Sequence, residues 1–204
     1  MRFLGLLTLW PGFVLAQGWI EYVDESGRFS VNLPGEPEVK SFVYDSEHDA
    51  QFPARLYTAK SATSSYSVTV VDFRDAQQIH VELLKHLSDA ERTRGSTRWI
   101  DDQRASVARA ARTFRQRDGE VTYDGWAKVQ GIEGHQLQIT NPEGSRTFAG
   151  MFFHGQEGFL YILEETVPAG APPPGQFQQS LAFLDEEGAR IRYRLQPDGS
   201  AARE

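Results

Sequence analysis

Apolar and polar residues alternate with a period of two over most of the chain, which is typical of β-strands. The signal is strongest over Thr147–Val167, where two runs of aromatic and β-branched residues flank a short glycine-containing loop. In the second run Phe159 and Tyr161 share one face, and Leu160 and Ile162 share the other. Because both faces are apolar, we expect this hairpin to lie in the middle of a sheet with other elements packed on each side.

Further strands are expected on both sides of this hairpin. They are Trp19–Val23, Arg28–Leu33, Val39–Tyr44, Ala54–Ala59, Ser65–Phe73, Gly125–Gln130, His135–Thr140 and Ala189–Leu195. Pro34 and Pro37 lack a backbone donor and end the second of these strands. The order of the strands indicates an antiparallel meander.

The spacing of apolar residues becomes helical in the middle third of the chain. It predicts one helix over Ala76–Arg92 and a second over Asp101–Arg117. After a proline-rich connector, Phe177, Leu181 and Leu184 recur at a spacing that predicts a short third helix. The fold class expected from these elements is α+β.

The first residues have the pattern of a secretory signal peptide. Arg2 supplies a positive start, Phe3–Leu15 is mostly apolar, and Val14 and Ala16 are small residues at the positions that a signal peptidase reads. We expect cleavage after Ala16 and a periplasmic or secreted protein. A retained anchor is the alternative, but the apolar run is shorter than the about 20 residues that span a bilayer.

Composition argues against nucleic-acid binding and excludes disulfide bonds. The 204 residues include 28 acidic and 21 basic side chains, for a net charge of −7, which argues against binding to nucleic acid. Cysteine is absent, so no disulfide stabilises the fold. We expect residues 17–204 to form a single α+β domain without a transmembrane segment, with residues 196–204 as a disordered tail.

Several short strings resemble a known family. They are GRFSVNLPGEP at Gly27–Pro37, SYSVTVVDF at Ser65–Phe73, GHQLQIT at Gly134–Thr140 and FLYILEETVPAG at Phe159–Gly170. With the arginine- and alanine-rich helix between them, they resemble uncharacterised bacterial exported proteins of the PsbP-like fold, shared by the photosystem II subunit and the Ran-binding import factor Mog. The resemblance implies an antiparallel β-sheet sandwiched by α-helices on both faces. It also implies an accessory or partner-binding role, with no catalytic residues to carry over.

Motifs for catalysis, metal binding or phosphate binding are absent from the sequence. There is no G-x-S-x-G nucleophile turn and no glycine-rich phosphate loop. His80 and His86 are six residues apart on an expected helix and point in different directions. His135 and His154 lie on expected strands that could be neighbours, so a two-histidine metal site is conceivable, but ordinary histidines are the favoured interpretation. We expect no cofactor and no metal.

Arginine is concentrated in the expected helical region. Eight arginines lie between Glu91 and Asp118, and Arg104, Arg112 and Arg115 are close together on a helical wheel. These three side chains are candidates for docking an acidic protein or an anionic membrane surface. The alternative is an exposed helix face whose arginines pair with acidic residues at the edges of the sheet.

Aromatic residues suggest a second type of site. Trp126, Phe152, Phe153, Phe159 and Tyr161 could line a cleft for a small apolar ligand, although aromatic residues at strand spacing more often form plain core. The favoured hypothesis is a non-enzymatic exported accessory or partner-binding domain. A carrier of apolar ligands is the alternative, and a hydrolase with a dispersed site is the third.

Overall fold

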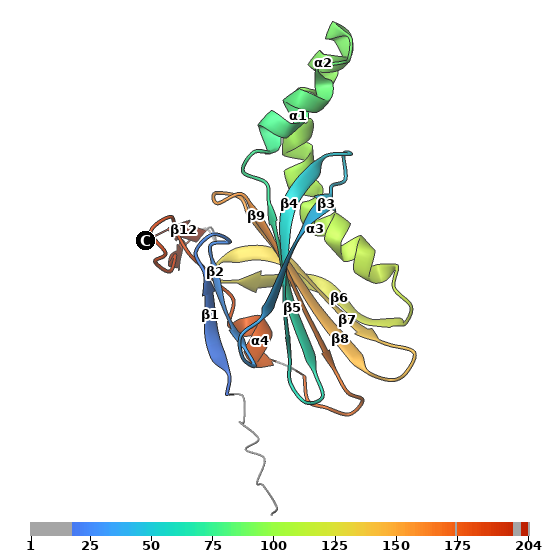
Figure 1. The fold of residues 1–204 in the computed structure, drawn as a ribbon, viewed down its shortest axis with the longest axis vertical. Helices are drawn as coiled ribbons and strands as arrows, with labels where there is room; N and C mark the ends of the chain where they lie inside the picture. Colours follow the sequence, from blue (N-terminus) through green and yellow to red (C-terminus); the bar gives the residue numbers. More distant parts are fainter. Residues whose placement is uncertain (1–17, 174, 198–200, 204) are drawn as a thin grey trace, which may run out of the picture.

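The computed structural model describes residues 18–173, 175–197 and 201–203, and the expected signal peptide lies outside them. The expected α+β class is wrong, because the fold is mostly β: 45% of the described residues lie in strands and 22% in helices. Its centre is an antiparallel sheet of seven strands in the order β3-β4-β5-β9-β8-β7-β6 (Figure 1). The strands are β3 (Glu38–Asp45), β4 (Gln51–Lys60), β5 (Ser65–Asp72), β6 (Glu120–Val129), β7 (Ile132–Thr140), β8 (Arg146–His154) and β9 (Phe159–Val167).

The hairpin with two apolar faces is central, as its pattern predicts. Strand β9 is the fourth of the seven strands and pairs with β5 and β8 over its whole length. Tyr161 and Leu163 are buried on one side of the sheet, and Leu160 is buried on the other. A central strand covered on both faces favours apolar residues on both of them, as the first four residues of β9 show.

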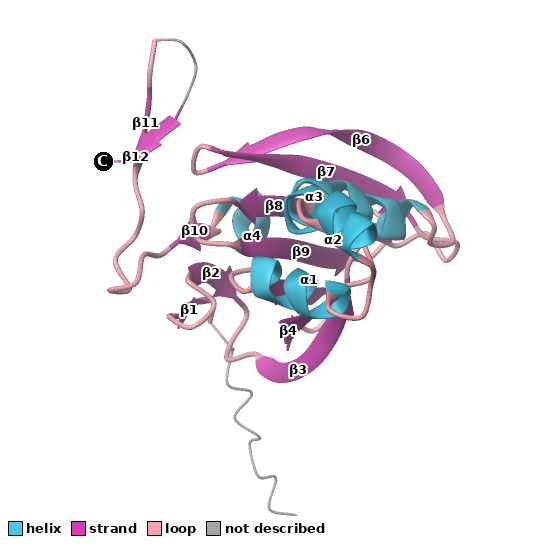
Figure 2. Cartoon of the chain, turned by 90° about the horizontal axis from the view of Figure 1, so that it is seen from above, coloured by secondary structure: helices cyan, strands magenta, loops and turns pink. Residues whose placement is uncertain are grey.

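Two smaller sheets lie outside the central one. Strands β1 (Ile20–Asp24), β2 (Phe29–Leu33) and β10 (Ala182–Phe183) form a three-stranded sheet in the order β1-β2-β10. Strands β11 (Tyr193–Leu195) and β12 (Ala201–Arg203) pair with each other and stand apart from the central sheet in Figure 2. The segment expected to be a disordered tail therefore includes a strand that pairs with β11.

Four helices are present in the described residues: α1 (Ala76–Leu84), α2 (Asp89–Gly95), α3 (Arg98–Arg115) and α4 (Gly175–Gln179). The single helix expected over Ala76–Arg92 is therefore wrong, because the chain breaks between α1 and α2. Ser88 begins α2 with a capping box in which the side chains of Ser88 and Glu91 bond each other's backbone N–H groups. Such a box satisfies N–H groups that a helix N-terminus leaves unpaired, so it favours a new helix start at this point.

The expectation of helices on both faces of the sheet is wrong. Helices α1 and α3 cover one face, where Phe52, Phe73 and Met151 are buried. The three-stranded sheet and the five-residue α4 cover the other face, where Phe29 and Phe183 pack against the central strands. Figure 2 shows these two groups on different sides of the sheet. An alternating strand such as β2 needs only one apolar partner surface, and its pattern does not reveal whether it joins the main sheet or forms its own layer.

Two expectations near the C-terminus also need correction. Leu181 and Leu184 do not share a helix with Phe177, because α4 ends at Gln179 and the chain continues as β10. The strand expected over Ala189–Leu195 is reduced to β11. Alternation was the only basis for that strand, and alternation alone does not provide a pairing partner.

Candidate functional site

The three arginines expected to form a docking surface do not form one free surface. Arg112 makes an ion pair with Glu47, and Arg115 donates to Asp124 through Nε at 2.6 Å and Nη2 at 2.8 Å. Arg104 is exposed, and it forms no ion pair with any residue in the described part of the chain. Two of the three guanidinium groups are therefore occupied by carboxylates of the same chain.

The pair between Arg115 and Asp124 belongs to a cluster at the edge strand β6. His135 Nε2 lies 2.5 Å from Asp124 Oδ1 and 3.0 Å from Arg115 Nη2. Hydrogen bonds from Arg115, followed by His135, hold the pKa of Asp124 well below its usual range. Arg117 similarly donates to both carboxylate oxygens of Glu164 on β9. These contacts fasten the C-terminal end of α3 to the sheet.

The five aromatic residues proposed as a cleft lie in three different places. Phe152, Phe159 and Tyr161 are buried in the core beneath β2, β10 and α4. Phe153 packs on the opposite face, and Trp126 is 79% exposed on the edge strand β6. The five side chains therefore do not line one cleft, and core packing accounts for three of them. Adjacent residues of a strand such as Phe152 and Phe153 point to opposite faces.

The two histidines considered for a metal site also lie on opposite faces of the sheet. His135 contacts Asp124 and Arg115 on the side of α3. His154 contacts Phe183 and Tyr193 on the side of the small sheet. A search of the described residues finds no group of three or more histidine, aspartate or glutamate side chains that could hold a metal ion.

A buried polar network that sequence patterns did not reveal surrounds Asp102 on α3. Its Oδ2 accepts a hydrogen bond from Ser46 Oγ at 2.6 Å and lies 2.8 Å from His80 Nε2. Its Oδ1 accepts from the backbone N–H of His48 at 3.0 Å. The residue types are those of a serine hydrolase, but here the carboxylate sits between serine and histidine. A hydrolase triad needs the histidine to contact the serine, so this arrangement lacks the nucleophile activation of a triad.

Sequence spacing gave no sign of this network, because its members come from a loop and two helices. Ser46 and Asp102 are 56 positions apart, and His80 and Asp102 are 22 apart. Both Asp102 and His80 are buried, which is uncommon for such residues unless they are hydrogen-bonded. The network fastens the turn between β3 and β4 to the helical layer.

A second buried polar cluster holds the C-terminal strands near the turn between β8 and β9. Tyr193 Oη lies 2.6 Å from His154 Nε2, and the backbone N–H of Glu157 donates to His154 Nδ1 at 3.2 Å. Because Nδ1 accepts a hydrogen bond, the neutral ring carries its proton on Nε2. Burial lowers the pKa of His154, which favours this neutral form. Arg203 reaches Glu157 in the same cluster at 3.3 Å.

Helices α1 and α2 form an arm that extends beyond the end of the central sheet (Figure 1). We use the name helical arm for residues 76–98. Three large apolar side chains on it are exposed: Val81 by 51%, Leu83 by 49% and Leu87 by 39%. Isolated exposed apolar residues are common, and of these three only Leu87 lines the groove between the two helices.

A groove of about 320 Å³ lies between the two helices of the arm and the start of α3. Its lining residues are Leu84, Leu87, Glu91, Arg94, Gly95 and Arg98. We call it the arm groove. It can form because Leu84 packs directly over Gly95, where an added Cβ atom would come within 2.7 Å of the leucine Cδ2.

The arginines of the arm groove, unlike Arg112 and Arg115 on α3, are not paired with carboxylates in the part of the chain that the structure describes. The Glu91 carboxylate accepts hydrogen bonds from the backbone and hydroxyl of Ser88, so it serves the helix start. Arg94 donates to the carbonyl oxygen of Ala90. Neither Arg94 nor Arg98 forms an ion pair within the ranges that the structure describes. An apolar floor is thus bordered by two guanidinium groups that form no ion pair with any carboxylate among the described residues.

Comparison with known proteins adds no identification. No protein-family model matches the chain, and no curated protein matches it. Among the described residues, no helix is both long enough and apolar enough to cross a membrane.

Proposed function

We propose that this protein is a non-enzymatic, exported accessory protein that binds a partner protein through the helical arm. The observation that carries the proposal is the combination of exposed apolar residues with unpaired Arg94 and Arg98 on an element that projects from the fold. The partner segment that fits is acidic and carries an aliphatic or aromatic residue. Export is supported by the apolar start of the sequence at Phe3–Leu15.

Two physical terms make such a segment the best fit to the arm groove. An aliphatic side chain placed over Leu84 and Leu87 removes apolar surface from water on both partners. Carboxylates beside it can bond Arg94 and Arg98, whose planar guanidinium groups match carboxylate geometry. The arm contrasts in this respect with the C-terminal part of α3, where Arg112 and Arg115 already bind carboxylates of the same chain.

A role without catalysis is supported by the burial and the existing hydrogen bonds of the two polar clusters around Asp102 and His154. Asp102 is buried and engaged by three hydrogen-bonding groups, and His154 is buried between Tyr193 and a backbone N–H. Both clusters join separate segments of the chain. A general acid or base needs to reach a proton of the substrate, and burial by the protein's own segments opposes that.

Selection from a phage-displayed library of random peptides tests the proposed function. We expect the mature protein to enrich peptides in which Asp or Glu neighbours Leu, Ile or Phe. The double variant Arg94→Glu/Arg98→Glu is expected to bind the selected peptides at least about tenfold more weakly, a loss of about 1.4 kcal/mol.

A matched control carries the same change in charge elsewhere. Lys60 and Arg192 are exposed and lie outside the arm, so Lys60→Glu/Arg192→Glu is expected to bind the selected peptides like the unmodified protein. Equal weakening in both double variants would show a general charge effect and contradict docking in the arm groove. Failure to enrich any peptide class would contradict the proposal as well.

A further inference from the structure

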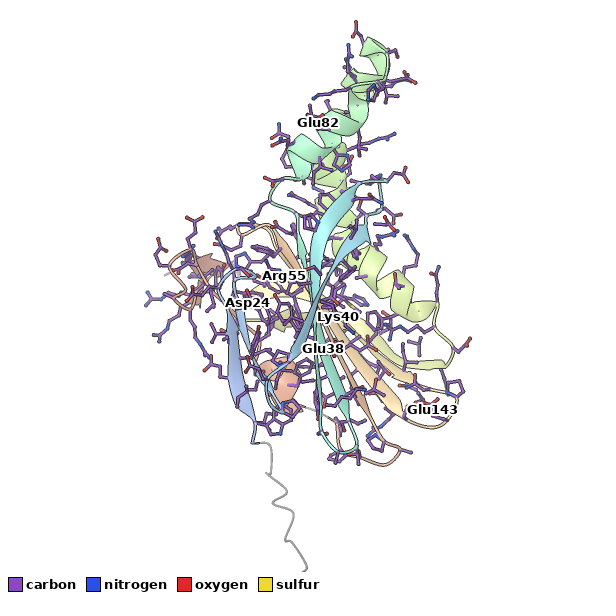
Figure 3. The ribbon with its side chains drawn as sticks, viewed as in Figure 1. Asp24, Glu38, Lys40, Arg55, Glu82 and Glu143 are labelled. Atoms are coloured by element: carbon purple, nitrogen blue, oxygen red, sulfur yellow. The ribbon has the colours of Figure 1, made fainter. Side chains whose placement is uncertain are left out.

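A cavity of about 250 Å³ lies between the β1–β2 turn and the central sheet, away from the helical arm. Its floor is apolar and includes Val70 and the buried Phe159. Its polar lining includes Ser26 in the turn, Arg55 on β4, Arg74 after β5 and the carboxylate of Asp72. Ser41 and Tyr57 line it as well. Figure 3 shows Asp24 at the end of β1 beside Arg55, and the closest contact of this pair is 3.7 Å.

Asp24 has little capacity left to accept hydrogen bonds from a ligand. Its Oδ2 accepts from the hydroxyl of Tyr57 at 2.7 Å, and its Oδ1 accepts from the backbone N–H of Gly27 at 2.7 Å and from the Ser26 hydroxyl. Although burial acts in the opposite direction, these hydrogen bonds lower the pKa of Asp24. The carboxylate is therefore a fixed negative charge that holds Arg55 in place.

Asp72 is occupied in a similar way by one arginine. Arg74 donates to it from its backbone N–H at 3.0 Å, from Nε at 2.9 Å and from Nη2 at 2.6 Å. The Arg74 guanidinium carbon also lies 4.8 Å from the centre of the Phe159 ring. This cation–π contact holds Arg74 over the floor of the cavity.

The two arginines therefore supply free donors to the cavity, whereas its two carboxylates are already engaged. A guanidinium group has five N–H donors. Arg74 uses Nε and Nη2 on Asp72, which leaves Nη1, and Arg55 bonds Ser26 through Nη1, which leaves Nε and Nη2. Both side chains are about half exposed, so these donors can reach a molecule in the cavity.

We propose that this cavity binds a small organic carboxylate, whose apolar part lies against the exposed Phe42 ring and whose carboxylate bonds Arg55 and Arg74. The size of the cavity suits a molecule of a few carbon atoms to one aromatic ring. Arginine favours such a ligand because its parallel N–H groups match the two oxygens of a carboxylate. The two aspartates keep both guanidinium groups oriented before the ligand arrives, which reduces the entropy lost on binding.

Titration with acetate, hexanoate and benzoate, followed by ¹H–¹⁵N NMR of the mature protein, tests this inference. We expect at least one of the three acids to shift the backbone resonances of Gly27 and Arg74 in a saturable way. Benzamide, which has the shape of benzoate without its charge, is expected to cause no saturable shift at these residues.

The variant Arg55→Lys/Arg74→Lys keeps the local charge and removes both planar guanidinium groups. We expect it to bind the active acid at least tenfold more weakly, while Arg192→Lys binds like the unmodified protein. Three results would overturn the inference: no saturable shift with any of the acids, equal shifts with benzamide, or unchanged affinity in the double variant. Each would show that the two arginines serve only their ion pairs with Asp24 and Asp72.

Discussion

His80 Nε2 lies 2.8 Å from Asp102 Oδ2, and both side chains are almost completely buried between α1 and α3. Asp102 also accepts hydrogen bonds from the Ser46 hydroxyl and from the backbone N–H of His48. One carboxylate thus joins two helices and the turn between β3 and β4. This carboxylate adds a polar attachment of the helical arm to the apolar packing of Ala76 and Ile79 against the sheet.

We expect Asp102→Asn to destabilise the protein by about 2–3 kcal/mol, because an amide NH₂ group would face donors where a carboxylate now accepts. Chemical unfolding with urea measures this loss. The neighbouring exposed Asp101 provides the control, since Asp101→Asn is expected to change the free energy of unfolding by less than about 0.5 kcal/mol. Equal effects of the two variants would show that the buried network adds nothing to stability.

Glu165 predicts a loss of stability at alkaline pH. It is 1% exposed, it lies between Tyr66 and Phe148 on the neighbouring strands, and no cation of the described residues pairs with it. Burial raises the pKa of Glu165 to about 8, although a hydrogen bond from Tyr66 opposes this shift.

The sign of the effect follows from the protons bound in each state. With a folded pKa above the ordinary 4.5, the folded state holds the proton more tightly than the unfolded state. The stabilisation is complete below pH 4.5 and is lost as pH rises through about 8. We expect the melting temperature of Glu165→Gln to vary less between pH 5 and 9 than that of the unmodified protein. Parallel pH profiles for the two proteins would rule out this role.

His154 predicts a loss of stability at acidic pH. Because burial lowers its pKa in the folded state, the unfolded state binds the proton more readily between the folded pKa and 6.5. Stability from this group is present above pH 6.5 and is lost as pH falls toward the folded pKa. We expect His154→Gln to flatten the decrease in melting temperature on this acidic side. If the melting temperature of His154→Gln decreases with falling pH as steeply as that of the unmodified protein, His154 does not contribute to the loss of stability in acid.

Replacing Gly95 with alanine is expected to destabilise the protein, although the same replacement usually stabilises a helix. Replacing glycine with alanine in a helix usually stabilises it by up to about 1 kcal/mol. At Gly95 the new methyl group would come within 2.7 Å of Leu84 Cδ2, so we expect a loss of about 1–2 kcal/mol instead.

Hydrogen exchange of the α2 amides measures this change locally, and thermal unfolding measures it globally. Gly155→Ala is the control, because an added Cβ there meets nothing closer than 3.9 Å. Slower exchange in the arm of Gly95→Ala would contradict close packing between Leu84 and Gly95.

Local patterns in the sequence predicted most of the strands but not the layers that cover the sheet. The two apolar faces of β9 placed it in the middle of the sheet, because only a strand covered on both sides needs them. The same reasoning could not tell what covers each face, since helices and a second sheet both bury apolar side chains. The small sheet of β1, β2 and β10 joins segments about 150 residues apart, and no local pattern encodes that pairing.

The candidate sites, too, were only partly predictable from the sequence. The sequence showed that arginines are concentrated around α3, but it could not show that Glu47 and Asp124 neutralise Arg112 and Arg115. Those partners come from a loop and an edge strand, so only the folded arrangement leaves Arg94 and Arg98 without an ion pair among the residues that the structure describes. The cavity at Arg55 and Arg74 also depends on the β1–β2 turn folding back over the sheet.

The sequence by itself determined most strands of the central sheet, the central position of the β8–β9 hairpin and the absence of disulfides, because side-chain alternation and composition are local properties. Tertiary structure alone decided the second sheet and which arginines of the described residues lack an ion pair. Those features depend on contacts between distant segments, whose energies no short stretch of sequence contains.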